Sequence, residues 1–295
     1  AFAVLCLACG LIGLGFGLSI AALNVLAIDR LPGRSAAAVA AVHMTLGIGS
    51  VIGPVLVGLL AGWKGAVLVG DGPWWLVPML GAAGAVGVLA VLGGVGHRDR
   101  SATPAGMQFG DLPARLLVFA AIALAYGGIE ALFINWSAIY VKEDLGGSDA
   151  IAGLALAAFF GAMAAARLVF ALASLRRPLR FLLVASPLAG AGAFAVMAGV
   201  NSAPLGVLAA ALGGVTLAPL FVYLLSLAAL EFSDRQTTVS GLMMAALMAG
   251  AGLSAIIVGV LRAQADLDTI FLAGGGISVL LAVAVVLLRP APLAA

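Results

Sequence analysis

Long apolar stretches, separated by short groups of charged and turn-forming residues, are the dominant pattern of this chain. Each stretch has about the 20 residues that a helix needs to cross a membrane. Only helices satisfy all their backbone polar groups within one segment in lipid, and the stretches lack the alternation of barrel strands. The pattern therefore predicts an all-α polytopic membrane protein with nine spans, over residues 2–28, 37–62, 74–95, 114–141, 149–173, 179–199, 204–231, 236–261 and 268–289.

The composition supports lipid as the main solvent. The chain is 64% hydrophobic and 9% charged, against roughly 25% charged residues in ordinary soluble domains. A net charge of +2 and the lack of an aromatic-interleaved basic patch argue against nucleic acid as a partner. No nucleophile–base set, phosphate loop or complete set of metal ligands occurs, so we expect neither an enzyme nor a cofactor or metal site.

The segments between the spans alternate in charge. Because cytoplasmic loops are enriched in Lys and Arg, the Arg-bearing segments are predicted to be cytoplasmic, with eleven basic residues against three on the other side. The eleven are Arg30, Arg34, Arg98, Arg100, Arg115, Arg167, Arg176, Arg177, Arg180, Arg235 and Arg289, and the three are Lys64, Lys142 and Arg262. The C-terminus is then cytoplasmic.

An internal repeat supports this count. The segment RSAAAVAAVHMTLGIGSVIGPVLVGLL (34–60) aligns without a gap to RQTTVSGLMMAALMAGAGLSAIIVGVL (235–261), an offset of 235 − 34 = 201. The same offset places the first span on the seventh and the third on the ninth. Parallel repeats of this length fit two six-helix bundles. We expect residues 1–95 to be the last three helices of a first bundle, 96–113 a cytoplasmic linker, and 114–295 the second bundle, with three earlier helices absent from the chain.

Two sets of segments resemble a known family. GLGFGLSIAALNVLAIDRLPGR with HMTLGIGSVIGP is similar to the fourth and fifth helices of fucose-permease-like members of the major facilitator superfamily. YGGIEALFINWSAIYVKEDLGGSDAIAGLALAAFFGAMAAARLV is similar to the seventh and eighth helices of that group and of related bacterial permeases. The resemblance implies a monomeric transporter in the inner membrane of a bacterium, with this chain as helices four to twelve. Such proteins move a small solute by alternating access between two helix bundles.

Glu130 is the acid that lies deepest in a predicted span. It is the fifteenth residue if the helix starts near Leu116, roughly 21 Å along the axis. Steps of about 100° place Tyr126, Glu130 and Ser137 on one face, as a polar stripe suited to a water-filled cavity. Desolvation favours the neutral form of a carboxyl group and a cationic neighbour favours the charged form, so Glu130 is our candidate for proton coupling. The alternative is a neutral Glu that only joins helices by a hydrogen bond.

Other polar and aromatic residues are candidates for lining a substrate cavity. Trp136 and Tyr140, four residues apart, could stack on a sugar ring beside Asn135, or form an interfacial aromatic belt. His43 and Asn24 could bind substrate, or hydrogen-bond between helices. Gly49, Gly53 and Pro54 are predicted to bend and pack the second span.

Four arginines, Arg115, Arg167, Arg176 and Arg177, are assigned to orientation and cytoplasmic gating. Arg167 is expected to extend its side chain to the cytoplasmic surface.

These observations predict a secondary active transporter of a sugar-like or other small polar metabolite, driven by protons through Glu130. Two alternatives stay open. One is an efflux antiporter of the same superfamily for drugs or metabolites. The other is a non-transporting membrane protein, either a receptor-like binding protein or a degenerate fragment.

Overall fold

The computed structural model describes residues 2–31, 34–61, 81, 112–176 and 179–288, and this part of the chain is helical, with short turns between the helices. Eight of its helices are long and apolar enough to cross a membrane. They are α1 (Phe2–Arg30), α2 (Ser35–Ala61), α4 (Ala114–Ile139), α5 (Asp149–Ser174), α6 (Leu182–Gly199), α7 (Ala203–Glu231), α8 (Gln236–Leu261) and α9 (Leu267–Leu288). The all-α polytopic class is confirmed. The predicted span 74–95, and residues 96–111 of the predicted linker, lie outside the described residues.

The helix bounds differ from the predicted spans by three residues or fewer. The largest difference is at the start of α6, where Leu182 and Leu183 donate to the carbonyls of Leu179 and Arg180 in a tight turn that precedes the helix. The end of α4 continues into a π-helical turn, η2 (Tyr140–Asp144), which carries the helix beyond its predicted end.

The repeat offset of 201 appears in the helix bounds. Helix α1 starts at Phe2 and ends at Arg30, and α7 starts at Ala203 and ends at Glu231, so both bounds differ by 201. Helix α2 starts at Ser35 and α8 at Gln236, again 201 residues apart. These two helix pairs therefore have the register that the sequence repeat predicts.

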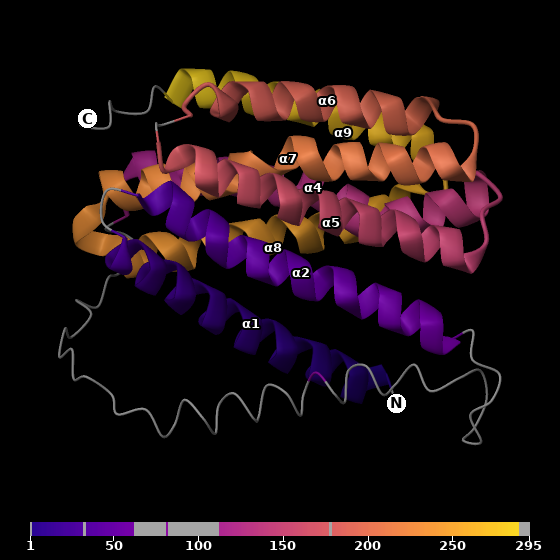
Figure 1. Cartoon of the computed structure of the whole chain (residues 1–295), viewed down its shortest axis with the longest axis horizontal. Helices are drawn as coiled ribbons and strands as arrows, with labels where there is room; N and C mark the ends of the chain where they lie inside the picture. Colours follow the sequence, from indigo (N-terminus) through magenta and orange to yellow (C-terminus); the bar gives the residue numbers. More distant parts are fainter. Residues whose placement is uncertain (1, 32–33, 62–80, 82–111, 177–178, 289–295) are drawn as a thin grey trace.

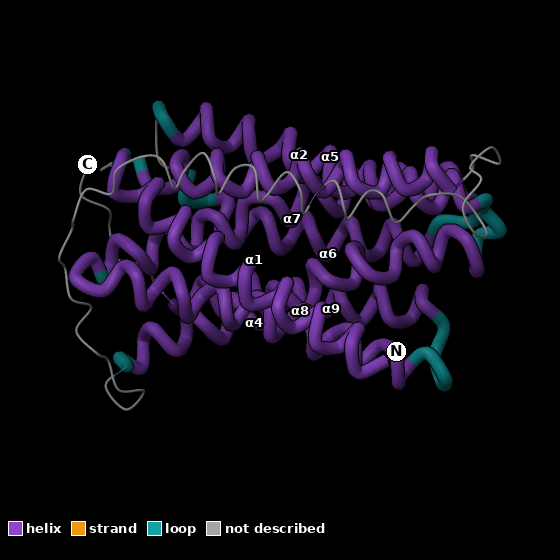
Figure 2. The backbone as a smooth tube through the Cα atoms, turned by 90° about the horizontal axis from the view of Figure 1, so that it is seen from below, coloured by secondary structure: helices purple, strands orange, loops and turns teal. Residues whose placement is uncertain are grey.

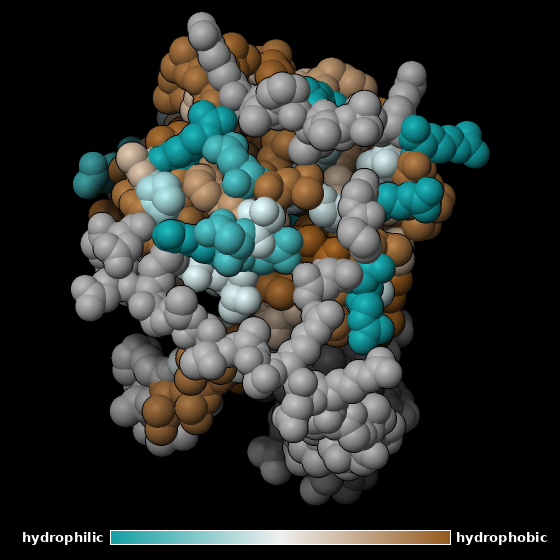
Figure 3. All heavy atoms as spheres, turned by 90° about the vertical axis from the view of Figure 1, so that its left-hand side faces the viewer, coloured by the Kyte–Doolittle hydropathy of each residue, from teal (hydrophilic) through white to brown (hydrophobic). Residues whose placement is uncertain are grey.

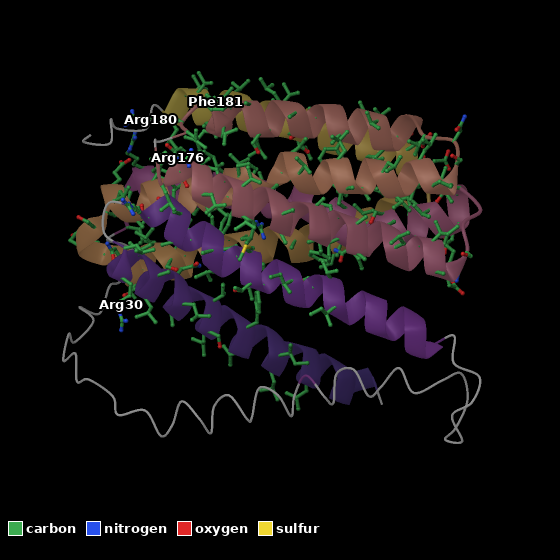
Figure 4. The ribbon with its side chains drawn as sticks, viewed as in Figure 1. Arg30, Arg176, Arg180 and Phe181 are labelled. Atoms are coloured by element: carbon green, nitrogen blue, oxygen red, sulfur yellow. The ribbon has the colours of Figure 1, made fainter. Side chains whose placement is uncertain are left out.

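The helices run side by side along the long axis of the molecule (Figures 1 and 2). The direction reverses from α1 to α2 and from each helix to the next between α4 and α9, whereas α2 and α4 run the same way. One end, which we call the Arg-rich end, carries Arg30, Arg34, Arg115, Arg176, Arg180 and Arg235. Hydrophilic residues gather on the face of this end (Figure 3), and Arg30, Arg176 and Arg180 all lie there (Figure 4). The opposite end, the acidic end, carries Glu143, Asp144, Asp149, Asp266 and Asp268.

Glycine allows two helix pairs to pack closely. In α4 and α8, a Cβ added at Gly127 would collide with the carbonyl oxygen of Leu247, and one added at Gly250 with that of Leu124. In α2 and α5, a Cβ at Gly47 would lie 2.9 Å from the Cβ of Ala164. Backbones approach this closely in membrane proteins where small residues face one another.

Aromatic side chains fill the core of the segment 114–288. Phe133 is fully buried and contacts the rings of Phe159, Phe194 and Phe271 at centroid distances of 5.5, 4.7 and 5.6 Å. Ser186 and Ser278 connect neighbouring helices, since their hydroxyls donate to the carbonyls of Thr216 and Pro187 at 2.6 and 2.7 Å. These contacts hold α6, α7 and α9 against α4 and α5.

Two hydrogen bonds near the Arg-rich end join α2 to α7 and α1 to α8. Ser35 at the start of α2 and Ser226 near the end of α7 form a buried hydrogen bond of 2.6 Å between their hydroxyls. Ser240 in α8 donates to the carbonyl of Ala21 in α1 at 3.1 Å. Further toward the start of α1, the described side chains from Leu7 to Leu18 are exposed or half-buried. In this conformation α1 therefore packs against α8 through its second half.

Candidate functional site

Glu130 lies in the middle of α4 and is 9% exposed. Its Oε1 atom lies 3.3 Å from Nη2 of Arg167 on α5 and 3.1 Å from the hydroxyl of Tyr126, one turn earlier on α4. A charged residue this deep in a membrane helix is costly unless it is paired and hydrogen-bonded. Glu130 is both, so its immediate surroundings can hold it in the ionised form.

The position of Arg167 corrects the sequence prediction. We expected its side chain to reach the surface at the Arg-rich end, but it is 7% exposed and paired with Glu130. The reason is the direction of the two helices. Side chains lean toward the N-terminus of their own helix, and α4 and α5 are antiparallel neighbours. Arg167 thus leans away from the Arg-rich end and Glu130 leans toward it, which brings the two charges together from different depths.

Tyr126 connects this pair to α7. Its buried hydroxyl lies 3.1 Å from Glu130 Oε1 and 3.0 Å from the carbonyl oxygen of Leu217. With ionised Glu130, the hydroxyl can donate to the carboxylate. With protonated Glu130, the carboxyl can donate to the tyrosine oxygen while the tyrosine donates to Leu217. Both protonation states have hydrogen-bond partners without a rearrangement of these atoms.

His43 is the residue of α2 that contacts the site. Nη1 of Arg167 donates to the backbone carbonyl of His43 at 3.4 Å, and the His43 ring packs edge-on against Phe221 at 5.6 Å. Phe221 in turn stacks on Tyr126 at 5.9 Å. The structure thus brings together His43, Tyr126, Glu130, Arg167 and Phe221 from α2, α4, α5 and α7. The Nε2 atom of His43 is buried and has no partner among the described residues.

The other predicted residues of α4 lie apart from this network. Ser137 is fully buried, but its hydroxyl donates to the carbonyl of Phe133 in its own helix at 2.6 Å. Asn135 is exposed. Trp136 is half-buried, with a buried Nε1 that has no partner among the described residues. Tyr140 is buried and packs against Phe271 at 5.4 Å. The predicted stripe of three polar residues therefore reduces to Tyr126 and Glu130, and these are enclosed by protein.

The remaining predicted residues lie on α1 and α2, outside this network. Asn24 is fully buried in α1, on a stripe with Ile20 and Ile28, and its amide atoms have no partner among the described residues. An added Cβ at Gly49 or Gly53 would meet no described atom within 4 Å, so the close approach of α2 to α5 lies at Gly47 instead. Pro54 is in the helical part of α2, and its side chain lies outside the described residues.

Arg115 joins three helix ends. Its guanidinium forms a two-point ion pair with Glu231 at the end of α7, and Nη1 donates to the carbonyl of Leu288 at the end of α9 at 2.9 Å.

Arg176 is exposed at the Arg-rich end, and Arg177 lies outside the described residues. At the acidic end, Arg262 binds Glu143 and Asp144 at 2.7 and 3.4 Å, which connects α8 to η2.

Sequence reasoning missed Phe221 and the carbonyl of Leu217, which supply the α7 side of the site. An apolar residue and a backbone oxygen leave no signal in a sequence this hydrophobic. Arg167 did leave one, because it lies seven residues before Ser174, roughly 10 Å inside the end of α5. Within the part of the chain that the structure describes, no three His, Cys, Asp or Glu side chains come together as a metal site.

Comparisons with known proteins agree with this architecture. A family model described as the Major Facilitator Superfamily matches residues 118–295. The crystal structure of a variant of the E. coli fucose:proton symporter FucP is similar with a TM-score of 0.71 and 14% sequence identity, over 92% of this chain and 73% of that one. At this identity the likeness shows a shared fold. No curated protein matches the sequence. The family match extends over more than half of the chain, and the chain belongs to the major facilitator superfamily.

Proposed function

We propose that this protein is a proton-coupled secondary transporter of a small polar solute, with Glu130 as the proton-binding group. Membership of the superfamily supports secondary transport. The single observation that carries the coupling is the buried network of Tyr126, Glu130 and Arg167, which offers hydrogen bonds to both protonation states of the carboxyl group. A group that only joined helices would not need two alternative sets of partners.

The same network links two parts of the protein. Arg167 contacts Glu130 in the proposed second bundle (114–295) and the carbonyl of His43 in the proposed first bundle (1–95), with 96–113 as the proposed linker between them. When Glu130 takes up a proton, its attraction for Arg167 weakens, and the contact between α5 and α2 is free to change. Protonation is thereby coupled to the relative movement of the bundles that alternating access requires.

We propose that the Arg-rich end faces the cytoplasm of a bacterium, because basic residues mark the cytoplasmic side of inner-membrane proteins. The hydrogen bonds Ser35–Ser226 and Ser240–Ala21 then close the cytoplasmic end in this conformation. The C-terminus is cytoplasmic in this orientation, and the protein acts as a monomer.

Transport by purified protein in liposomes tests this function. The solutes are a panel of neutral sugars and sugar acids, and uptake is measured with and without an inward proton gradient. Glu130→Gln should abolish gradient-driven accumulation and retain exchange of solute across the membrane, since the neutral amide mimics the protonated carboxyl group. Asp234→Asn, at an exposed acid of the Arg-rich end, is the matched control and should behave as the unaltered protein. Full gradient-driven accumulation by Glu130→Gln would overturn the coupling role.

A further inference from the structure

The guanidinium of Arg167 has hydrogen-bonding capacity that the described residues leave unused. Nη2 meets one oxygen of Glu130 at 3.3 Å and Nη1 meets the carbonyl of His43 at 3.4 Å, both long for such contacts. Nε is buried without a partner among the described residues. A guanidinium is a planar fork of five donors that suits a carboxylate held by two parallel hydrogen bonds. Glu130 uses only part of this fork.

A second unsatisfied polar group adjoins the first. Nε2 of His43 is buried without a described partner, and the residue is 5% exposed. Its backbone carbonyl receives the hydrogen bond from Arg167, so the two residues are neighbours on α2 and α5. Buried polar groups are hydrogen-bonded in the great majority of cases. Unsatisfied groups on two residues that contact each other, from different helices, indicate a polar ligand.

The charge balance of the site indicates which ligand. Glu130 and Arg167 are the acidic and basic side chains that are buried among the described residues, and together they are neutral. A proton on Glu130 leaves Arg167 as a buried cation without a counter-ion, which is strongly unfavourable. A neutral solute cannot correct this imbalance. A solute with a carboxylate restores neutrality and can use both sides of the guanidinium fork.

We propose that the transported solute is a monocarboxylate, whose carboxylate takes the place of Glu130 on Arg167 and receives a further contact from His43. The proton adds to a carboxyl oxygen of Glu130, the Glu130–Arg167 ion pair separates, and the solute carboxylate pairs with Arg167. One proton and one monoanion are then carried together, so transport is electroneutral. By linkage, each of the two favours the binding of the other. The pairing with a proton rests on the proposed function, whereas the unused donor of Arg167 and the unsatisfied nitrogen of His43 do not.

The groups around Glu130 fit this exchange. On its own helix Tyr126 supplies the hydroxyl, on α5 Arg167 supplies the cation, and α2 reaches the site through His43. On α7 the neighbours of Tyr126 are Leu217 and Phe221, and the buried Tyr223 packs against Phe170. The buried polar residues of α8 and α9 in the described part are Ser240 and Ser278. Among these groups Arg167 is the basic side chain that can pair with a carboxylate.

Binding in detergent, without any gradient, tests the proposal. The probes are matched pairs of a sugar acid and its neutral sugar, D-galacturonate with D-galactose and D-glucuronate with D-glucose, together with L-lactate. Binding is measured by thermal stabilisation at about pH 5.5 and about pH 8, because a solute that binds together with a proton should bind more tightly at the lower pH. The variants are Glu130→Gln, Arg167→Gln, Arg167→Lys and the charge-balanced double variant Glu130→Gln/Arg167→Gln. Arg262→Gln, at a paired arginine of the acidic end, is the control.

We expect at least one carboxylate to bind the unaltered protein about tenfold or more tightly at the lower pH, while its neutral counterpart does not bind. Glu130→Gln should bind it equally at both pH values, Arg167→Lys weakly, and the double variant not at all, although that variant keeps the site neutral and remains folded. Arg262→Gln should bind as the unaltered protein does. Preferred binding of the neutral sugars, undiminished carboxylate binding by the double variant, or no carboxylate binding at either pH would overturn the proposal.

The two proposals fail separately. If carboxylate binding depends on Arg167 but gradient-driven uptake stays intact in Glu130→Gln, the proton role of Glu130 is rejected and the carboxylate site is retained. If Glu130→Gln loses gradient-driven uptake but the protein selectively binds neutral sugars, the carboxylate site is rejected and the proton role of Glu130 is retained.

Discussion

Arg167 on α5 and Glu130 on α4 form an ion pair with 3.3 Å between Nη2 and Oε1, and their side chains are 8% and 12% exposed. The pair joins two antiparallel helices, and both side chains are largely shielded by the surrounding protein. Each buried charge is therefore stabilised mainly by the other, so we expect the loss of one charge to affect stability differently from the loss of both.

Removal of one partner of this pair should cost more stability than removal of both. Arg167→Gln leaves the Glu130 carboxylate buried without its cation, and breaking a buried ion pair in this way costs about 3–5 kcal/mol. In the double variant Glu130→Gln/Arg167→Gln neither charge remains, so most of the loss should be recovered. Thermal unfolding in detergent at about pH 8, where carboxyl groups ionise most fully, measures the difference. Additive losses in the double variant would show that the two charges do not depend on each other.

The hydroxyls of Ser35 and Ser226, 2.6 Å apart, offer a direct test of movement at the Arg-rich end. Cysteines at these positions, in a background with Cys6 and Cys9 replaced by serine, should form a disulfide with little distortion, because a disulfide needs Cβ atoms only about 3.5–4.5 Å apart. Oxidation should then stop transport by holding α2 against α7, and reduction should restore it.

Each single cysteine variant serves as the control and should be insensitive to the oxidant. Transport that continues at its full rate after complete cross-linking would mean that these helix ends stay together throughout the cycle.

Helices α4 and α8 should separate when a methyl group is added at their contact. A Cβ at Gly250 would overlap the carbonyl oxygen of Leu124, whereas a Cβ at Gly252 would meet no described atom within 4 Å. Gly250→Ala should therefore destabilise the protein by about 1–3 kcal/mol through overpacking. Gly252→Ala should be neutral or slightly stabilising, because alanine favours helix. Equal melting temperatures for the two variants would contradict the close approach of these helices.

The ion pair between Arg115 and Glu231 should stabilise the Arg-rich end of the segment 114–288. Arg115→Ala removes both the two-point contact with Glu231 and the hydrogen bond to the carbonyl of Leu288. The side chains are 40% and 20% exposed, so the expected loss is only about 1 kcal/mol. The exchange Arg115→Glu/Glu231→Arg should recover part of it, as measured by thermal unfolding at low and high salt. A double exchange no more stable than Arg115→Glu alone would argue against the pair.

The sequence by itself determined the helices, their order and the gathering of arginines at one end. Span bounds follow from the length of apolar stretches, which depends on residues next to one another in the chain, and they agree with the structure within three residues for the eight described helices. The repeat offset could also be read from the sequence alone, by comparing its segments, and the starts and ends of α1 and α7 reproduce it. Glu130 was recognisable because an acid in the middle of an apolar span is unusual whatever surrounds it.

Only the tertiary structure decided what Glu130 contacts. The pairing with Arg167 depends on α4 and α5 being antiparallel neighbours, so that two side chains of different depth lean toward each other. For the same reason Gly47, and not Gly49, lies at the approach of α2 to α5, because the face that a helix presents is set by its neighbour. In a chain this uniformly apolar, hydropathy fixes where a helix lies along the chain but not how it is rotated about its axis. That rotation, which packing alone sets, selects the residues that form the site.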